Sequence, residues 1–153
     1  VLDGGAGNDV VTTGAVLVAT ASVDAGAGTA DRLVVANTNH IRVDGTSKAL
    51  GDLYKGFEQV QVESGVNLNL ANLSTNNTID TVRINQNGAF SATVNNLSAA
   101  AAGNVTIVNA APTTAGTNII TIGVKGATTA GQIDTVLSFH SCHEWQAQKC
   151  QKQ

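Results

Sequence analysis

Short runs of β-branched residues, separated by glycine, asparagine and aspartate, limit what this chain can form. In several runs apolar and polar residues alternate, as at Val60 and Val62 and at Val66, Leu68 and Leu70. That spacing is the period of a strand with one buried face. Because aromatic residues make up only 3% of the chain and Met is absent, the core has to be built from Val, Ile, Leu and Ala, which suit thin layers between strands. We therefore expect an all-β fold.

The expected strands are residues 9–12, 16–18, 32–35, 41–43, 60–62, 66–70, 81–84, 105–108, 119–122 and 135–137. Residues 46–57 differ, because their apolar side chains follow helical spacing. We expect a short helix or an ordered loop there that caps one end of the strand stack, and a plain surface loop is the alternative. Residues 72–77 and 99–103 are expected to be connectors, because they consist of turn-forming or small residues.

Charge excludes several classes of function. Charged residues make up 12% of the chain, the formal net charge is −3, and the eight Lys and Arg residues are scattered. Nucleic-acid binding needs a basic patch, so we expect no nucleic-acid partner. No apolar run is long enough for a transmembrane helix. A weakly charged surface favours self-association, which suits an assembling coat better than a cytosolic enzyme.

The first third of the chain contains an approximate repeat. Residues 1–11 and 23–34 share the order aspartate, glycine-rich stretch, Ala-Gly, aspartate and apolar pair, with one residue inserted in the second copy. Repeats of roughly 20 residues indicate a solenoid. The copies are degenerate, so they do not by themselves extend a solenoid over the whole chain.

Residues 4–12 fit the nonapeptide pattern Gly-Gly-x-Gly-x-Asp-x-apolar-x at every defined position. This pattern suits calcium, a hard cation that takes several oxygen ligands in loose geometry. Glycine lets the backbone turn tightly so that carbonyl oxygens point inward, and the aspartate supplies charge. The second copy, residues 25–33, departs twice: Ala25 replaces the first glycine, and one residue is inserted before Asp31.

The nonapeptide resembles the RTX family of calcium-binding β-rolls. The resemblance implies a right-handed parallel β-roll or β-solenoid of short strands, with a calcium ion between adjacent turns. The implied ligands are the carboxylates of Asp9 and Asp31 and the glycine-loop carbonyls of Gly5, Gly7, Gly26 and Gly28. Asp3 and Asp24 occupy matching places before the two loops, where they either bind the metal or cap the turn. Two ordinary glycine turns with solvated aspartates are the alternative.

The wider chain is similar to bacterial surface-layer proteins and related surface proteins exported by type I secretion. The similarity rests on Ala-, Thr- and Asn-rich short strands and on the phrase Gly-Phe-Glu-Gln-Val at residues 56–60. It implies a secreted, extracellular protein of the cell surface that folds with calcium and self-associates in a lattice, with cell-surface polysaccharide as a further candidate partner. We expect a structural calcium-binding module. An RTX accessory module of a secreted enzyme or adhesin is the alternative, and a metal-free β-sandwich or β-helix adhesin domain is a third.

Catalytic residues are not expected. The motifs of zinc metalloproteases and serine hydrolases are missing from the sequence, and His40 is isolated. Asp80 and Asp134 recur in Ile-Asp-Thr-Val phrases, which we interpret as turns that begin strands. Glu58 and Glu63 flank a strand, and we expect both on a solvated face.

Residues 140–153 differ sharply from the rest. They hold both Cys residues, the only Trp and two of the three His residues, in a spacing that matches no zinc module. We expect one calcium-binding domain, residues 1–139, followed by a disordered or non-natural tail. We leave undecided whether Cys142 and Cys150 form a local disulfide in that tail. The chain begins without Met, so we interpret this domain as a fragment of a larger protein. The lack of Cys in residues 1–139 suits export.

Overall fold

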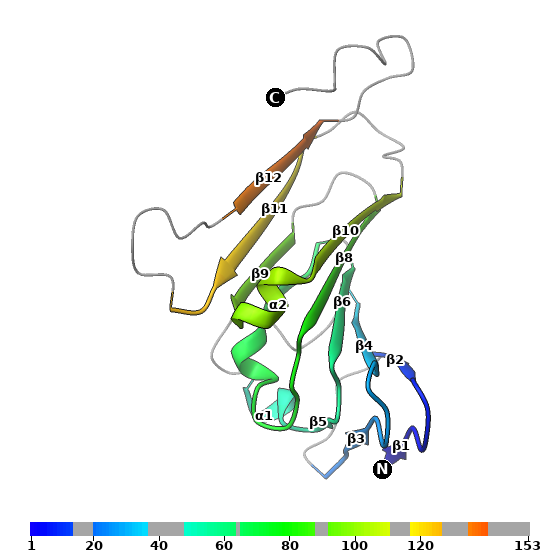
Figure 1. The fold of residues 1–153 in the computed structure, drawn as a ribbon. Coiled ribbons are helices and arrows are strands. Elements are labelled where there is room, and N and C mark those ends of the chain that lie inside the picture. The colour runs from blue at the N-terminus through cyan, green and yellow to red at the C-terminus, as the bar shows by residue number, and fades with distance from the viewer. Residues whose placement is uncertain are drawn as a thin grey trace.

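The computed structural model describes residues 1–13, 20–36, 48–63, 65–87, 92–110, 117–126 and 135–140. In these residues the chain forms a right-handed parallel β-solenoid of about four turns (Figure 1). The expected all-β class and solenoid architecture are confirmed. Among the described residues, none of the helices is both long and apolar enough to span a bilayer.

Three sheets form the walls of the solenoid. The long sheet runs, in spatial order, through β10 (Val105–Ala110), β8 (Thr81–Asn87), β6 (Gln59–Glu63), β4 (Arg32–Val35) and β2 (Val10–Thr12). The second sheet runs through β12 (Thr135–His140), β11 (Thr117–Val124), β9 (Ala92–Leu97) and β7 (Asn67–Asn69). The short sheet runs through β1 (Leu2–Asp3), β3 (Val23–Asp24) and β5 (Tyr54–Lys55). Every pair of neighbours is parallel except β11 and β12.

The core is a set of apolar rows that run across the strands. One inward row of the long sheet consists of Val11, Leu33, Val60, Val82 and Val105, and the next consists of Val35, Val62, Ile84 and Ile107. The second sheet faces them with the row Leu68, Val94 and Ile122. Because the strands alternate with period two and pair in register, apolar residues meet apolar residues in every turn.

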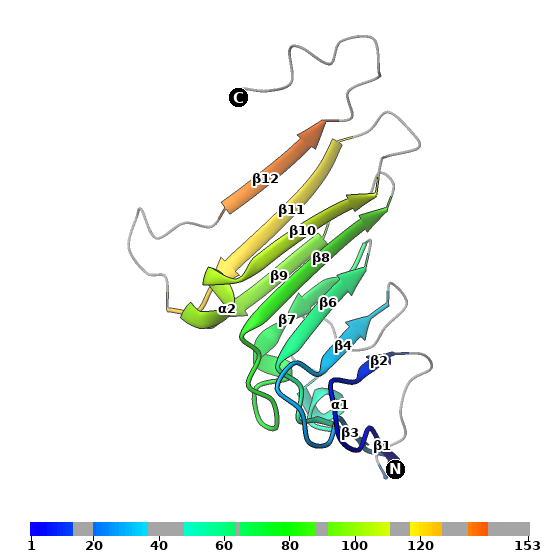
Figure 2. The same ribbon diagram turned by 45° about the vertical axis from the view of Figure 1, so that its right-hand side comes forward.

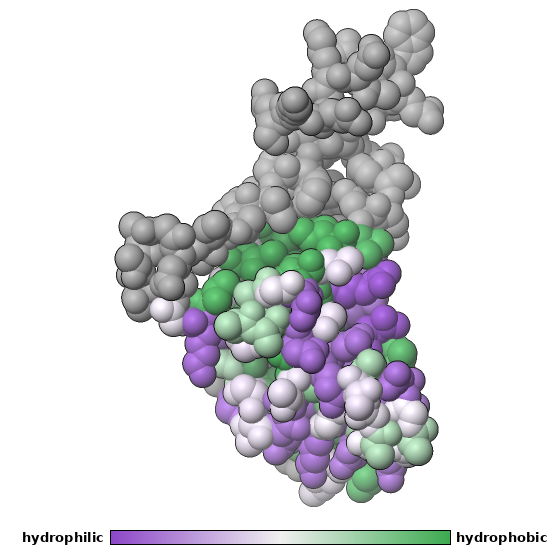
Figure 3. Space-filling view, viewed as in Figure 1, coloured by the Kyte–Doolittle hydropathy of each residue, from purple (hydrophilic) through white to green (hydrophobic). Residues whose placement is uncertain are grey.

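The outer face of the long sheet is polar. Arg32, Gln59 and Thr81 form one outward row, and Gln61 and Arg83 lie in the next. Figure 2 shows the five strands of this sheet side by side. In Figure 3 hydrophilic side chains cover much of the lower part of the visible face, and hydrophobic ones gather over the upper turns. The outward rows thus mix neutral polar side chains with the charged Arg32 and Arg83, and Val10 and Val34 are their apolar members.

Short helical segments occupy the approach to the long sheet in the later turns. The segments η2 (Leu70–Asn72) and α2 (Ala99–Gly103) precede β8 and β10 of the long sheet, and α1 (Lys48–Gly51) precedes β5 of the short sheet. A Cβ at Gly51 would lie 2.0 Å from the carbonyl oxygen of Asn72, so α1 and η2 are in direct contact. The side chain of Ser98 caps α2 by accepting a hydrogen bond from the Ala101 N–H.

The helix expected in residues 46–57 forms as α1, but it does not cap an end of the stack. The next element, β5, pairs with β3, and β6 lies between β4 and β8. The segment is therefore the third turn of the solenoid. Tyr54 and Phe57 are buried as solenoid residues rather than as one face of a helix, because neighbouring turns cover them on both sides.

Most expected strands are confirmed where the structure describes them. Residues 16–18 and 41–43 lie outside the described residues, as does most of the tail, 141–153; His140, which was assigned to the tail, is the last residue of β12. Residues 99–103 form α2, so the expectation of a plain connector was wrong. The strand β9 and the short strands β1, β3 and β5 were missed. The run Ala92–Leu97 has few β-branched residues, and its inward places are filled by Ala92, Val94 and Leu97.

The row packing predicts a large effect of truncating one inward residue. Leu33 is fully buried and pairs across the sheet with Val11 and Val60. We expect Leu33→Ala to lower the free energy of unfolding by about 2–5 kcal/mol, because the turns above and below cannot both collapse into the cavity. Val10→Ala on the neighbouring strand, where the side chain is 56% exposed, is the control and should change stability little. Urea unfolding of the two variants measures the difference; equal losses would contradict the packing.

Candidate metal centre

The two glycine loops lie directly on top of one another. Before the loops Asp3 pairs with Asp24, within them Ala6 bridges to Ala27, and after them β2 pairs with β4. The Ala27 N–H donates to the Gly5 carbonyl (2.6 Å), and the Gly7 N–H donates to the Ala27 carbonyl (2.9 Å). The inserted residue is absorbed after Ala27, so the loops remain in register and the approximate repeat is a structural one.

Glycine is required where the second loop meets the first. A Cβ at Gly26 would lie 2.2 Å from the Gly5 carbonyl oxygen, and a Cβ at Gly28 would lie 2.4 Å from the Gly7 carbonyl oxygen. Both distances are far below any contact that a carbon atom tolerates. The glycines therefore permit two backbone segments to approach closely, which is what brings the carbonyl oxygens of one loop against the other.

The two nonapeptide aspartates point into the space between the loops. Asp31 is fully buried, and its Oδ1 accepts a hydrogen bond from the Asp9 N–H at 2.7 Å. The Oδ2 atoms of Asp9 and Asp31 are both buried without a hydrogen-bond partner. Buried carboxylate oxygens are normally paired, because an unpaired one loses its hydration without compensation. These two oxygens therefore lack a positive partner.

Carboxylate and carbonyl oxygens lie close together at two places along the stacked loops. The point that a Cβ of Gly28 would occupy lies 2.4 Å from the Gly7 carbonyl oxygen, 2.5 Å from Asp31 Oδ2 and 2.7 Å from Asp31 Oδ1. The corresponding point at Gly4 lies 2.3 Å from the Ala25 carbonyl oxygen and 2.9 Å from Asp9 Oδ2. Both loops thus contribute oxygens of the kind that calcium prefers, and the set mixes charged and neutral ligands as calcium sites do.

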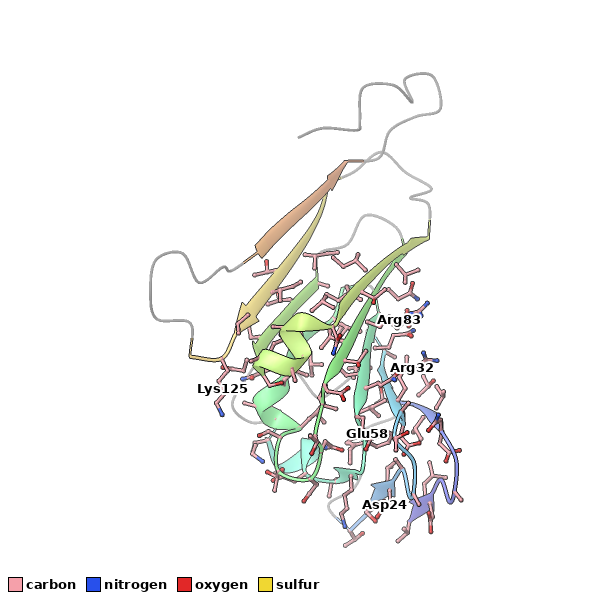
Figure 4. All side chains as sticks on the ribbon, in the orientation of Figure 1. Asp24, Arg32, Glu58, Arg83 and Lys125 are labelled. Carbon is pink, nitrogen blue, oxygen red and sulfur yellow. The ribbon has the colours of Figure 1, made fainter. Side chains whose placement is uncertain are left out.

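Asp3 and Asp24 cap the turns that begin the loops. The Gly5 N–H donates to Asp3 Oδ1 at 3.0 Å, and the Gly26 N–H donates to Asp24 Oδ1 at 3.1 Å. An aspartate that accepts from the amide two residues onward stabilises a tight turn. Figure 4 shows Asp24 low in the molecule, near β3. One oxygen of each carboxylate is therefore committed to its own loop.

An acidic row continues beyond the two loops. Asp9, Asp31, Glu58 and Asp80 immediately precede β2, β4, β6 and β8, whose first residues pair in register. Like charges about 5 Å apart repel by roughly 3 kcal/mol at an effective dielectric constant near 20. The only ion pair among the described residues joins Lys48 to Asp52. The row is therefore not neutralised by Lys or Arg in the part of the chain that is described.

The interpretation of Glu58 as a solvated residue was wrong. Its Oε2 accepts a hydrogen bond from the Asp31 N–H at 2.9 Å in a partly buried position. Asn8 was also missed, and its Oδ1 accepts from the Thr29 N–H of the second loop. The signal that could have identified Glu58 is an acidic residue at the start of four expected strands or within the two residues before it. Asp80, in contrast, accepts from its neighbour Thr81, as expected of a turn that begins a strand; Asp134 and His40 lie outside the described residues.

Side chains alone do not complete a metal site. Within the described ranges, no group of three or more His, Cys, Asp or Glu side chains lies close enough to hold an ion. Any cation between the loops therefore depends on backbone carbonyl oxygens for part of its coordination. Calcium accepts such ligands, whereas zinc prefers nitrogen and sulfur.

A separate cleft of about 240 Å³ lies beside η2. It is lined by Leu70, Ala71, Ser74, Asn77, Thr78, Ile79, Asn96, Ser98 and Lys125. Several of its polar groups already bind within the chain: Asn96 Nδ2 donates to Asn69 Oδ1, and Asn77 Nδ2 donates to the Tyr54 and Leu73 carbonyls. The arrangement resembles a structural amide network more than a set of groups for catalysis.

Comparison of the chain with protein-family models, with curated proteins and with solved structures gives no match.

The close approach of the two loops predicts that a methyl group added at Gly28 lowers stability. In Gly28→Ala the new Cβ would meet the Gly7 carbonyl and the Asp31 carboxylate, so we expect a loss of about 1–3 kcal/mol in the free energy of unfolding. Gly103→Ala is the matched control, because a Cβ there has nothing within 4 Å and alanine favours a helix. Thermal unfolding compares the two; a neutral Gly28→Ala would show that the loops are not in contact.

Proposed function

We propose that this chain binds calcium between residues 4–9 and 25–31, and that the ion fastens the first two turns of the solenoid together. One observation carries the proposal: the Oδ2 atoms of Asp9 and Asp31 are buried and unpartnered, and each lies close to a carbonyl oxygen of the other loop. A divalent cation would offset both charges and would take up the carbonyl oxygens of Gly7 and Ala25 as further ligands.

The proposed role of the ion is structural. The two carboxylates lie between stacked backbone segments, where Asp31 is fully buried, instead of lining a cleft that could admit a substrate. We therefore propose a structural calcium-binding module of a secreted surface protein. Extracellular calcium modules work with dissociation constants of about 10⁻⁴–10⁻³ M, so such a module would stay loose inside a cell and become rigid outside it. An accessory module of a secreted enzyme or adhesin would use the same ion in the same way.

Calcium is expected to stabilise the chain, and Asp31→Asn is expected to remove the effect. At about a hundred times its dissociation constant, an ion that binds only the folded state adds roughly 2.7 kcal/mol to the free energy of unfolding. In Asp31→Asn the amide oxygen can still accept from the Asp9 N–H, but the buried charge is gone. The variant should therefore be at least as stable as wild type in EGTA and should gain nothing from calcium. Melting curves in EGTA and in millimolar calcium measure both effects.

Asp52→Asn is the control for this experiment, because Asp52 is an acidic residue of another part of the solenoid that pairs with Lys48. Its calcium response should equal that of wild type. Identical wild-type curves in EGTA and in calcium would refute the metal site.

Self-association is proposed for the intact parent protein. The supporting features are a chain of which only 12% of the residues are charged, a sheet face that carries neutral polar side chains such as Gln59, Gln61 and Thr81, and end strands that carry unpaired backbone groups. We expect light scattering of the full-length parent to show large particles with calcium and small ones in EGTA. Small particles under both conditions, together with hydrolase activity, would favour the accessory module instead.

A further inference from the structure

The third turn of the solenoid lacks a glycine loop. The short sheet continues through β5, and the long sheet continues through β6, but only Gly56, Phe57 and Glu58 connect the two strands. In the second turn residues 25–31 make the same connection between β3 and β4. Phe57 is fully buried, so an apolar side chain fills the space that the loop occupies in the turn below.

Glu58 stands where the aspartates stand in the first two turns. Its first following residue, Gln59, pairs with Arg32, which in turn pairs with Val10. The hydrogen bond from the Asp31 N–H to Glu58 Oε2 (2.9 Å) repeats the bond from the Asp9 N–H to Asp31 Oδ1 (2.7 Å). Each carboxylate therefore holds the backbone of the acidic residue one turn below it.

Glu58 forms hydrogen bonds with both backbone polar groups of Asp31. The Glu58 N–H donates to the Asp31 carbonyl at 3.2 Å, and the Glu58 side chain accepts from the Asp31 N–H. The Glu58 carbonyl is itself held from above, because it accepts from the Asp80 N–H at 2.9 Å. The Gln59 N–H also donates to the Asp31 carbonyl, at 2.9 Å, so Asp31 is attached to the third turn through Glu58 and Gln59, and Glu58 alone holds the Asp31 N–H.

We propose that Glu58 is a positioning residue for calcium, which fixes the backbone of Asp31 so that the Asp31 carboxylate faces the gap between the loops, and that it ends the row of calcium loops. This inference rests on the proposed calcium site. Glu58 acts through Asp31, because its turn has no glycine loop whose carbonyl oxygens could complete a second site.

The positioning role depends on the length of the side chain at residue 58. Glutamate carries one methylene more than aspartate, and the connection that it ends is the shortest of the three. A glutamine at this position keeps the reach and an acceptor oxygen but loses the charge. An aspartate keeps the charge but carries its carboxylate one methylene nearer its own backbone, so we expect it to hold the Asp31 N–H less well than the Glu58 Oε2 that now accepts from it at 2.9 Å. The pair Glu58→Gln and Glu58→Asp therefore separates positioning from charge with mild substitutions.

Isothermal titration of the full chain with calcium chloride tests the proposal. We expect Glu58→Gln to bind calcium within about threefold of wild type. We expect Glu58→Asp to bind about tenfold or more weakly, as is usual when a group that orients a metal ligand is lost. Melting in EGTA should differ little between the two variants, and amide exchange at Asp31 should be faster in Glu58→Asp than in wild type.

Glu63→Gln and Glu63→Asp are the matched controls. Glu63 is the last residue of β6, the strand that Glu58 precedes, and it accepts hydrogen bonds from the side chains of Gln61 and Asn85 instead of from a backbone amide. Both should bind calcium as wild type does. Equal calcium affinities of Glu58→Gln and Glu58→Asp, whether both match wild type or both are weaker, would overturn the positioning role while leaving the calcium site intact. A wild-type chain that does not bind calcium would overturn both.

Discussion

In-register stacking of parallel strands is the constraint on which the rest of this structure depends. Each residue of a turn lies about 4.8 Å above its counterpart in the turn below, so every position becomes a row of similar side chains. For Val, Leu and Ile this is favourable, because the rows Val11–Leu33–Val60–Val82 and Val35–Val62–Ile84 merge into a continuous apolar interior. The same rule places acidic residues next to one another at the start of four strands.

The acidic row runs through all four turns, so the first two turns differ from the later ones in the connection that leads to the long sheet. Where the connection to the long sheet is a glycine loop, carbonyl oxygens and buried carboxylates meet in a gap that a calcium ion would fill. From the third turn onward the chain approaches the sheet by other means: Phe57 enters the core, and η2 and α2 form short helical segments. These turns bury apolar side chains, and that burial contributes to their stability.

This division gives the proposed function a physical basis. A solenoid body that folds by apolar burial would present a template onto which two calcium-dependent turns are added. Glu58 stands at the boundary and belongs to both parts, since its backbone is held by the turn above and its side chain holds Asp31 below. A module of this kind responds to calcium at one end only.

The sequence by itself determined the strand period, the glycine loops and their alignment, because these depend on neighbours along the chain: alternation at Val60 and Val62, and the repeated order of glycine and aspartate in residues 4–9 and 25–31. It left open whether Asp3 and Asp24 cap turns, where residues 46–57 lie, and what Glu58 contacts. Only the tertiary structure decided these, since Asp31 and Glu58 are 27 residues apart in the chain and meet because the turns stack. Burial of a carboxylate is likewise a property of the turns above and below it, which no local pattern specifies.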